Sequence, residues 1–456
     1  MSYKAVNPYT NETLNEYENA TTQEIEAALQ TAAELAKQWE TEKRSNRKTI
    51  LQAVAQQFRT QKAAMAKIMT QEMGKLIGEA EDEVDLCANI ADYFAEHADE
   101  FLEPTEIPTK NAKAVVLKQP LGPIIACEPW NFPLYQVMRI FAPNFMVGNP
   151  VILKHASIVP GSARKIAAII EAAGAPTGSL TNLFLDYDQI AEVIADPRIT
   201  GAALTGSERG GKEVAKVAGE NLKKSTLELG GNDAFVVLED VDKDLLYQVA
   251  PAARLANTGQ TCTASKRFII PDALYDEFVQ KLTAAFAEVK MGDPLLQETT
   301  LAPLSSKKGK EKLQKQVDEA VEAGATVVYG TQPVDLPGQF FMPTILTDIT
   351  PENPVFDQEL FGPVAQVYRV KSEEEAIQLA NNSRYGLGSV VMSSDPEHAF
   401  RVASQIKAGM SFVNHGWTSL PELPFGGVKN SGYGRELSES GMLSFVNEHL
   451  IYEAKN

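Results

Sequence analysis

Short apolar segments alternate with amphipathic ones along most of the chain, and this alternation restricts the fold more than any other feature. Runs such as NPVILKHA, ITGAALTG and KSTLEL are typical of strands, and the intervening GSARKIAAIIEAAG and ERGGKEVAKVAGENL have a helical period. Strands that alternate with helices indicate a doubly wound parallel sheet. The richness of these runs in Val, Ile and Leu suits strands that are covered on both faces. The sequence therefore predicts an α/β fold.

The alternation starts again after LGGND, at Leu229–Asp233, and continues through AFVVLED, ASKRFIIP, AQVYRV and GSVVMSS to SFVN. A chain of 456 residues is too long for a single comfortable core. We therefore expect a second α/β domain after the first. The N-terminal part is predicted to be helical, beginning with a capping box formed by Thr21 and Glu24. The C-terminal run SFVNEHLIYEA alternates like a strand but has no obvious partner, so we expect it to join the sheet of a neighbouring subunit.

Charge and cysteine usage exclude several classes of protein. The net charge of −18 argues against nucleic acid or an anionic membrane surface as a partner, because both require a basic surface. No apolar run approaches the ~20 residues of a membrane span, and no secretory signal is apparent at the start. Three widely spaced cysteines, Cys87, Cys127 and Cys262, suggest a reducing cytoplasm rather than a disulfide framework. The five histidines show no metal-ligand spacing, so no metal is expected.

Cys262 lies in the polar segment ANTGQTCTASKR, where a core cysteine would be out of place. A thiol attacks an electrophilic carbon as the thiolate, so either its pKa must be lowered or a base must assist. Backbone N–H groups and the nearby Lys266 and Arg267 would favour the anion. Most free cysteines are small buried hydrophobic residues, and this alternative suits Cys87 and Cys127 better. We interpret Cys262 as a candidate nucleophile.

Two further segments supply candidate groups for acid–base chemistry. Glu228 lies between leucines in LELGGND, where burial would raise its pKa toward the range of a general base; the alternative is an edge glutamate before a turn. Asn131 lies between Pro129 and Pro133, in a loop whose rigidity would let its amide donate to an oxyanion. The alternative for this loop is a structural turn with Trp130 in the core.

Three weaker signals remain. Arg139 falls in an apolar helix and therefore needs an anion, which is more often a protein carboxylate than a ligand. Thr205–Gly206–Ser207 joins a strand to a helix, as a phosphate site would, but lacks the G-x-G-x-x-G spacing. In DQELFGPVAQV, Glu359 could hold ribose hydroxyls and Phe361 could pack on a nicotinamide, although taken alone this segment is a turn.

In their order along the chain, these segments resemble the aldehyde dehydrogenase superfamily. The matching segments are PWNFP, Lys154, TGS, LELGG, GQTCTA, ELFGPV and LPFGGVKNSGYGRE, and they span most of the chain. Within that superfamily, KHAS, GSERGG and WTSLPELPFGG resemble the succinate-semialdehyde dehydrogenases of bacteria. The resemblance implies a Rossmann-like cofactor domain at residues 1–110 and 124–230 and a catalytic domain at 231–430. It also implies a small β oligomerisation element at 111–123 and 440–456, and hence a homodimer or homotetramer.

By the same resemblance, Cys262 attacks the aldehyde, Asn131 and the Cys262 N–H hold the oxyanion, and Glu228 activates the water that hydrolyses the thioester. The residues implied to bind the cofactor are Trp130, Lys154, Ser157, Thr205, Gly206, Ser207, Leu229, Glu359 and Phe361. NAD-preferring members usually carry Glu at the position of Ser157. A carboxylate there would repel a 2′-phosphate, whereas a serine can hydrogen-bond it beside Lys154. We therefore expect NADP as cofactor, with NAD less favoured.

The expected substrate is succinic semialdehyde, with Arg139 and Ser419 near its distal carboxylate and Phe425 beside it. Glutarate semialdehyde or a broad range of aldehydes remains an alternative, as does acyl transfer to coenzyme A or phosphate instead of hydrolysis. A catalytically inactive scaffold on the same fold is the alternative from another class. Intact Cys262, Glu228 and Asn131 argue against it.

Overall fold

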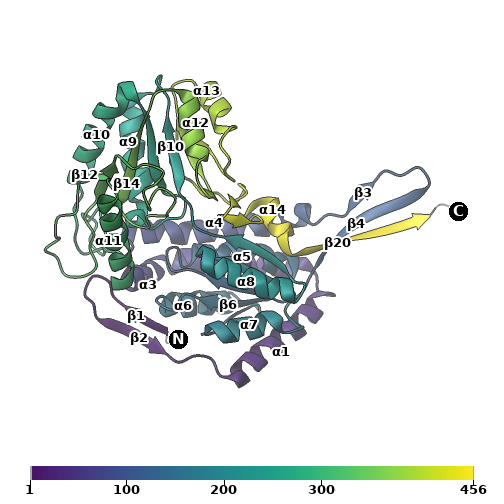
Figure 1. Ribbon diagram of the computed structural model, residues 1–456. Helices are drawn as coiled ribbons and strands as arrows, with labels where there is room; N and C mark the ends of the chain where they lie inside the picture. Colours follow the sequence, from purple (N-terminus) through teal and green to yellow (C-terminus); the bar gives the residue numbers. More distant parts are fainter. Residues whose placement is uncertain (1–2, 455–456) are drawn as a thin grey trace.

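Two α/β lobes and a projecting strand arm make up the computed structural model, which describes residues 3–454 (Figure 1). The lobe that contains the N-terminus is built on a six-stranded sheet with the order β19-β9-β8-β5-β6-β7. Its strands are β5 (Ile124–Glu128), β6 (Val151–His155), β7 (Leu180–Asn182), β8 (Gly201–Thr205), β9 (Lys224–Glu228) and β19 (Gly432–Tyr433). Strands β5 to β9 are parallel, and β19 pairs with β9 antiparallel.

Helices cover both faces of this sheet, because successive strand residues point to opposite sides. One face carries α2 (Arg44–Thr60), α3 (Lys62–Met73), α4 (Ile77–Phe101), α5 (Tyr135–Val147) and α6 (Pro160–Ala172). The other carries α1 (Thr22–Trp39), α7 (Tyr187–Ala195) and α8 (Glu208–Glu220). In β5, Ile124 and Ala126 pack into the first layer, and Ile125 and Cys127 pack into the second.

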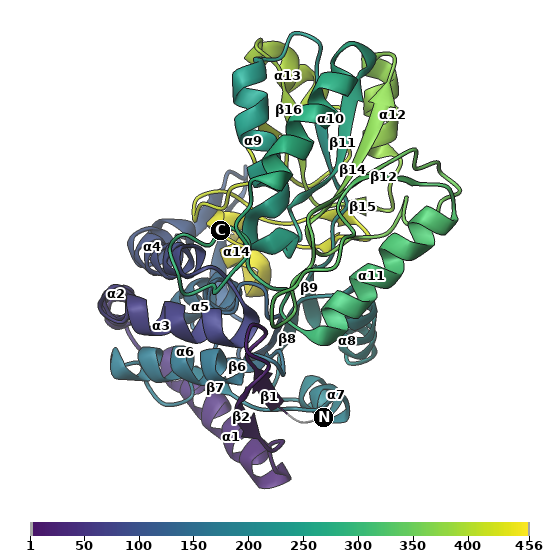
Figure 2. The same cartoon turned by 90° about the vertical axis from the view of Figure 1, so that its left-hand side faces the viewer.

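The second lobe has a seven-stranded sheet with the order β12-β13-β14-β11-β10-β16-β17. Its strands are β10 (Asp233–Val237), β11 (Ser265–Pro271), β12 (Thr326–Tyr329), β13 (Thr344–Thr347), β14 (Val364–Val370), β16 (Ser389–Met392) and β17 (Phe412–Val413). Its helices are α9 (Lys243–Leu255), α10 (Asp272–Ala287), α11 (Lys307–Glu322), α12 (Glu373–Asn381) and α13 (Pro396–Ala403). Figure 2 shows α11 reaching from this lobe toward α8 of the other.

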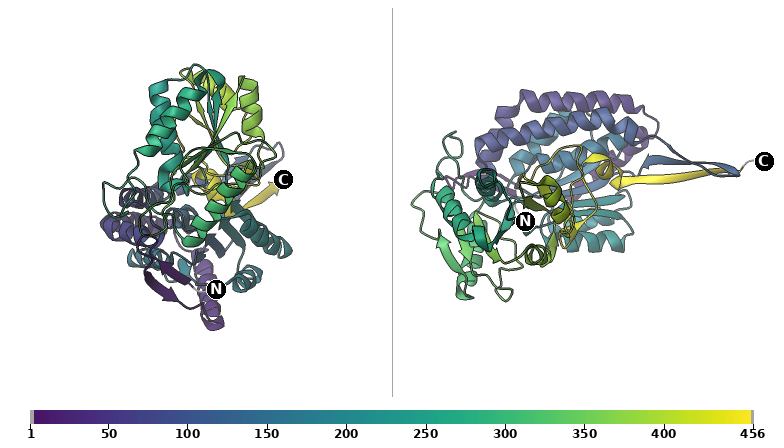
Figure 3. Two further views of the ribbon diagram at one scale, coloured as in Figure 1. Left: turned by 60° about the vertical axis from the view of Figure 1, so that its left-hand side comes forward. Right: turned by 90° about the horizontal axis from the view of Figure 1, so that it is seen from above.

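The strand arm consists of β3 (Thr105–Ile107), β4 (Ala112–Pro120) and β20 (Val446–Ala454). It extends away from both lobes, with the C-terminal end of β20 at its tip (Figures 1 and 3). β20 pairs antiparallel with β4 over its whole length, from Val446↔Pro120 to Ala454↔Ala112. The C-terminal strand thus has a partner in its own chain, where the sequence suggested none. Its apolar side chains Leu450, Ile451 and Tyr452 nevertheless remain exposed.

The α/β fold predicted from the sequence is confirmed, as is the capping box, in which Thr21 and Glu24 bond to each other's backbone N–H. Prediction missed the N-terminal hairpin of β1 (Tyr3–Val6) and β2 (Thr13–Tyr17) and the strand β13. Short elements complete the fold: β15 (Tyr385–Gly386), β18 (Val428–Lys429), η1 (Ala256–Gly259), α14 (Ser438–Met442) and η2 (Leu443–Phe445). No helix between residues 3 and 454 combines the length and apolar character that crossing a membrane requires.

Candidate active site

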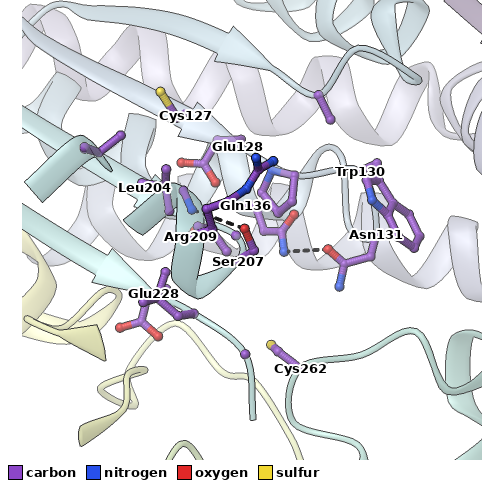
Figure 4. A pocket seen from close by; sticks show the side chains of 18 of the residues that line it. Cys127, Glu128, Trp130, Asn131, Gln136, Leu204, Ser207, Arg209, Glu228 and Cys262 are labelled. Atoms are coloured by element: carbon purple, nitrogen blue, oxygen red, sulfur yellow. Dashed lines mark hydrogen bonds between the residues drawn. The ribbon is translucent and has the colours of Figure 1, made fainter. Parts of the chain in front are cut away.

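A cavity of about 840 Å³ lies where the parallel strands of the six-stranded sheet end at their carboxyl edge. Strands β5, β8 and β9 deliver Glu128, Thr205 and Glu228 to this edge. The second lobe closes the cavity with Cys262, residues of α11, and the loop that carries Glu359 and Phe361. Carboxyl ends of parallel strands are the usual place for ligands in open α/β sheets. Figure 4 shows Glu128, Asn131, Glu228 and Cys262 around this space.

A strained turn holds Cys262 at the cavity. The backbone φ angles of Asn257, Thr258 and Gly259 are 52°, 55° and 73°, three successive left-handed residues. The glycine is required, because a Cβ at Gly259 would lie 2.4 Å from the carbonyl oxygen of Gly362. The Asn257 N–H donates to Glu79 Oε1 at 2.7 Å, and its amide donates to the Asn131 carbonyl at 2.9 Å. These contacts fix the segment that presents the thiol.

Burial raises the pKa of Cys262 to about 12, and the positive charges of Lys266 and Arg139 offset this only in part. Lys266 is already engaged: its Nζ donates to the Thr261 carbonyl at 2.9 Å and lies 3.4 Å from Glu359 Oε1. The expectation that neighbouring cations would favour the thiolate is therefore not met in the free chain. The thiol is protonated at neutral pH, so a base must accept its proton.

The rate at which iodoacetamide alkylates Cys262 is expected to rise about tenfold per pH unit between pH 7 and 10. Only the thiolate reacts, and its fraction grows tenfold per unit at every pH below the pKa. Quenched samples analysed by mass spectrometry of the Cys262 peptide measure this rate. A rate that levels off above about pH 9 would mean that the thiol has an ordinary pKa of about 8.5. The rate at Cys87, which is fully enclosed in α4, serves as the internal control.

Glu228 ends β9 and is only 2% exposed. Its Oε1 lies against Gly426, where an added Cβ would approach it to 2.6 Å. Burial, followed by the charge of Glu436, raises the pKa of Glu228 well above its usual range, while Arg139 and Arg435 pull it down. A carboxyl group with a raised pKa is matched to accept a proton near neutral pH.

Asn131 lies in the loop between β5 and α5, which is fixed at several points. Its Nδ2 donates to the Gln260 carbonyl at 3.0 Å. Farther along, the Pro133 carbonyl lies 2.7 Å from His155 Nε2, while His155 Nδ1 accepts the Ala156 N–H. Because Nδ1 accepts, Nε2 carries the proton and donates to Pro133. The loop is therefore rigid, as the two prolines predicted.

All nine residues predicted to bind the cofactor line this one cavity: Trp130, Lys154, Ser157, Thr205, Gly206, Ser207, Leu229, Glu359 and Phe361. Ser207 caps α8 by accepting the Gly210 N–H at 3.3 Å, so the positive end of that helix faces the cavity. Trp130 and Phe361 meet edge to face, with ring centroids 5.7 Å apart. Glu359 is held by the Gly231 N–H at 3.1 Å. A long ligand with a central anionic group fits these features.

The three residues expected near a substrate carboxylate do not line the cavity but form a separate cluster. Arg139 is 1% exposed and forms an ion pair with the equally buried Glu436. Its guanidinium also stacks 4.2 Å from the centroid of the Phe425 ring. Arg139 Nη1 donates to the Tyr135 hydroxyl at 3.4 Å, and that hydroxyl lies 2.5 Å from Ser419 Oγ. The structure thus connects Arg139 to Ser419 through Tyr135.

Sequence reasoning missed several residues of the site. Arg209, Lys312 and Gln316 line the cavity, the last two from α11. No local sequence pattern marks these residues, because α11 is an ordinary amphipathic surface helix. Only the packing of the two lobes brings α11 to the cavity. Glu128 also lines the cavity at the end of β5, and Gln136 does so from the first turn of α5. A charged residue at the end of a predicted parallel strand was the signal that could have identified Glu128.

Fold and site together define a two-lobed α/β protein with a thiol at the end of a cavity suited to a dinucleotide. Residues 1–451 match the family model described as the aldehyde dehydrogenase family. The chain is 47% identical to the succinate-semialdehyde dehydrogenase [NADP(+)] of Deinococcus radiodurans over 98% of its length and 94% of that protein. The chain belongs to the aldehyde dehydrogenase family, as the sequence motifs predicted.

A solved structure and a further relative agree with this assignment. A succinic semialdehyde dehydrogenase from Streptococcus pyogenes, in complex with NADP+, is 55% identical, with a TM-score of 0.98 over 99% of this chain and all of that one. The probable succinate-semialdehyde dehydrogenase [NADP(+)] of Synechocystis is 44% identical, the match covering 85% of this chain and 86% of that protein. The similarity to the Streptococcus pyogenes structure spans both lobes and the arm.

Proposed function

We propose that the protein oxidises succinic semialdehyde to succinate with NADP as cofactor. The observation that carries the proposal is the convergence of Cys262, Glu228, Asn131 and the nine predicted cofactor residues on one cavity. The names of the relatives from Deinococcus radiodurans and Streptococcus pyogenes support the substrate and the cofactor. When bound, the nicotinamide supplies a hydride acceptor, which no side chain can provide.

In the proposed reaction, the Cys262 thiol loses its proton to a base, the sulfur forms a bond to the aldehyde carbon, and the carbonyl electrons move to oxygen. The Asn131 amide and the Cys262 N–H donate to that oxyanion. Loss of hydride from the same carbon leaves a thioester on Cys262. Glu228 takes a proton from water, the water oxygen adds to the thioester carbon, and the sulfur leaves as thiolate. Because Glu228 has a raised pKa, it is suited to this proton transfer.

Cofactor binding is assigned to the side chains that line the cavity. Lys154 and Glu359 would hold ribose hydroxyls, Ser207 and Trp130 would lie at the pyrophosphate, and Phe361 would position the nicotinamide. The N-terminus of α8 and the cavity-lining Arg209 and Lys312 add positive charge against the field of a chain with net charge −18. Ser157, beside Lys154, leaves space for a 2′-phosphate where a longer acidic side chain would repel it.

Ser157→Glu is expected to lower kcat/KM for NADP by about 10²-fold or more, because placing like charges together costs several kcal/mol. The same carboxylate can accept a ribose 2′-OH, so kcat/KM for NAD should hold or rise. Steady-state kinetics with both cofactors measure the change. Ser157→Ala is the matched control, because it removes the hydroxyl without adding charge. It should lower kcat/KM for NADP about tenfold. Equal losses for both cofactors in Ser157→Glu would remove Ser157 from the 2′-phosphate site.

The substrate carboxylate is proposed to lie at Ser419, with the charge of Arg139 acting from behind through Tyr135. Kinetics on a matched panel of aldehydes, with and without a terminal carboxylate, test this assignment. Succinic semialdehyde should have the highest kcat/KM, and Ser419→Ala should raise KM for it while leaving KM for butanal unchanged. Similar kcat/KM for butanal and succinic semialdehyde would point to a broad-specificity enzyme. Arg139→Ala is a poorer probe, because it leaves Glu436 unpaired in the core.

Two alternative activities make different products. Transfer of the acyl group to coenzyme A or phosphate would require that acceptor for turnover, whereas hydrolysis through Glu228 yields free succinate without it. An inactive scaffold would give no burst of reduced cofactor on mixing with aldehyde. The intact trio of Cys262, Glu228 and Asn131 favours hydrolysis.

The strand arm is proposed to join subunits into a homodimer or homotetramer in the cytoplasm. Leu450, Ile451 and Tyr452 are 55%, 46% and 60% exposed on β20, an apolar surface that a second copy would cover. Sedimentation velocity of the full chain and of a Leu450→Asp/Tyr452→Asp variant tests this. Equal mass for both would assign assembly to another surface.

A further inference from the structure

The orientation of the Asn131 amide is determined by its neighbours. The carbonyl oxygen of Gln260 can only accept a hydrogen bond, so the part of the Asn131 side chain 3.0 Å from it must be the NH₂ group. The Asn131 Oδ1 therefore faces the other way, and there Gln136 Nε2 donates to it at 3.1 Å. Figure 4 shows this bond as a dashed line.

Both ends of this chain of bonds are anchored. The Gln260 carbonyl also accepts from the amide of Asn257 at 3.3 Å, and Asn257 belongs to the strained turn before Cys262. Gln136 is 2% exposed in α5, where its backbone N–H donates to the Phe132 carbonyl at 3.1 Å. Neither the Gln260 carbonyl nor the Gln136 side chain can move far without disturbing the buried element that holds it.

We propose that Gln136 is a positioning residue that fixes the Asn131 amide with its second N–H directed at the oxyanion. One Nδ2 hydrogen is used by Gln260, so one remains for the substrate oxygen. If Gln136 did not occupy Oδ1, that buried acceptor would be unsatisfied, and the amide would rotate toward any other donor. A rotated Asn131 amide would raise the barrier of the reaction, because the charge that the amide stabilises develops on the substrate oxygen in the transition state. This inference rests on the proposed role of Asn131.

Gln136→Met retains length and approximate volume but cannot donate, and a double-mutant cycle with Asn131→Ala measures the coupling. Gln136→Met is expected to lower kcat for succinic semialdehyde by about 10- to 10²-fold in the parent chain, a part of the ~10²–10³-fold cost of losing an oxyanion donor. KM for NADP should stay the same. In the Asn131→Ala background, the same change should alter kcat by less than about twofold, because no amide is left to orient.

Two further measurements separate positioning from a general loss of structure. The alkylation rate of Cys262 should be unchanged in Gln136→Met, because alkylation develops no oxyanion. Gln366→Met, which removes another fully buried glutamine from β14 in the second lobe, should lower the melting temperature without lowering kcat.

Equal losses from Gln136→Met in both backgrounds, or no loss in the parent, would overturn the inference while leaving the proposed function intact. If Asn131→Ala alone kept full activity, the oxyanion role of Asn131 would fail first, and with it the proposed mechanism. The two failures are therefore distinguishable from the single variants.

Discussion

Cys262→Ala is expected to lower kcat for aldehyde oxidation by about 10⁴-fold or more, the scale of loss seen when a covalent nucleophile is removed. No other thiol can replace it. Cys87 is fully buried in α4, and Cys127 reaches the cavity from β5 at a place far from Asn131 and Cys262 (Figure 4). Rapid mixing with NADP and succinic semialdehyde should also show no burst of reduced cofactor.

The matched control for this change is Cys87→Ala, which removes a sulfur from the core and none from the cavity. Cys87→Ala should lower the free energy of unfolding by about 1 kcal/mol and leave kcat unchanged. NADP binding should survive in Cys262→Ala, since the thiol lies at one end of a cavity lined by many other groups. Undiminished oxidation by Cys262→Ala would disprove covalent capture.

The groups that prediction found share a physical property: each is marked by its immediate neighbours. Cys262 lies in a polar segment, Glu228 ends an apolar strand, and Asn131 lies between prolines. Parallel strands bring their carboxyl ends to one edge, so strand-end residues converge once the alternation is recognised. For this reason the α/β fold and the candidates Cys262, Glu228 and Asn131 could be predicted from local patterns. The roles of cofactor residues such as Lys154 and Ser157 were implied by the family resemblance instead.

The groups that prediction missed depend on contacts between distant parts of the chain. Arg139 was expected at a ligand, yet its buried partner is Glu436, almost 300 residues later. β20 had no visible partner because β4 lies more than 300 residues earlier. Lys312 reaches the cavity only because α11 extends from the second lobe toward the first. Local periodicity carries no information on which distant groups pair, because that is decided by packing of the whole chain.

The pKa of Cys262 shows that local sequence is also a poor guide to electrostatics. Two cations follow it in sequence, which suggested a stabilised thiolate. In the fold, Lys266 is occupied by backbone carbonyls and Glu359, and Arg267 donates to the carbonyls of Asn232, Leu379 and Ala380. Desolvation of the thiol then outweighs them. The sequence shows which charged residues neighbour Cys262, but it does not show whether other groups already bind those charges.

Glu228→Gln is expected to leave a burst of about one reduced cofactor per site and to lower the steady-state rate by about 10²–10⁴-fold, the usual contribution of a general base. Acylation of Cys262 and loss of hydride need no base on water, whereas hydrolysis of the thioester does. The fold should tolerate the change well: burial already favours the neutral carboxyl form, which glutamine imitates in shape and charge. Stopped-flow absorbance followed by steady-state measurement gives both quantities.

Glu72→Gln is the matched control for this change. Glu72 is likewise a buried carboxylate whose pKa is raised by burial, but it caps α6 through the Gly161 and Ser162 N–H groups and does not line the cavity. Its replacement should lower the melting temperature while the ratio of burst to steady-state rate stays that of the parent. A Glu228→Gln enzyme with an unchanged steady-state rate would exclude Glu228 as the base for hydrolysis.

The burst rate in Glu228→Gln separates two roles that the carboxylate can have. If Glu228 also accepts the thiol proton, the burst will be slow near neutral pH and will accelerate as hydroxide takes over deprotonation of Cys262 at higher pH. If another base serves the thiol, the burst rate will match the parent at every pH, and only hydrolysis will be lost. The comparison therefore identifies which group accepts the proton of a thiol whose pKa burial raises to about 12.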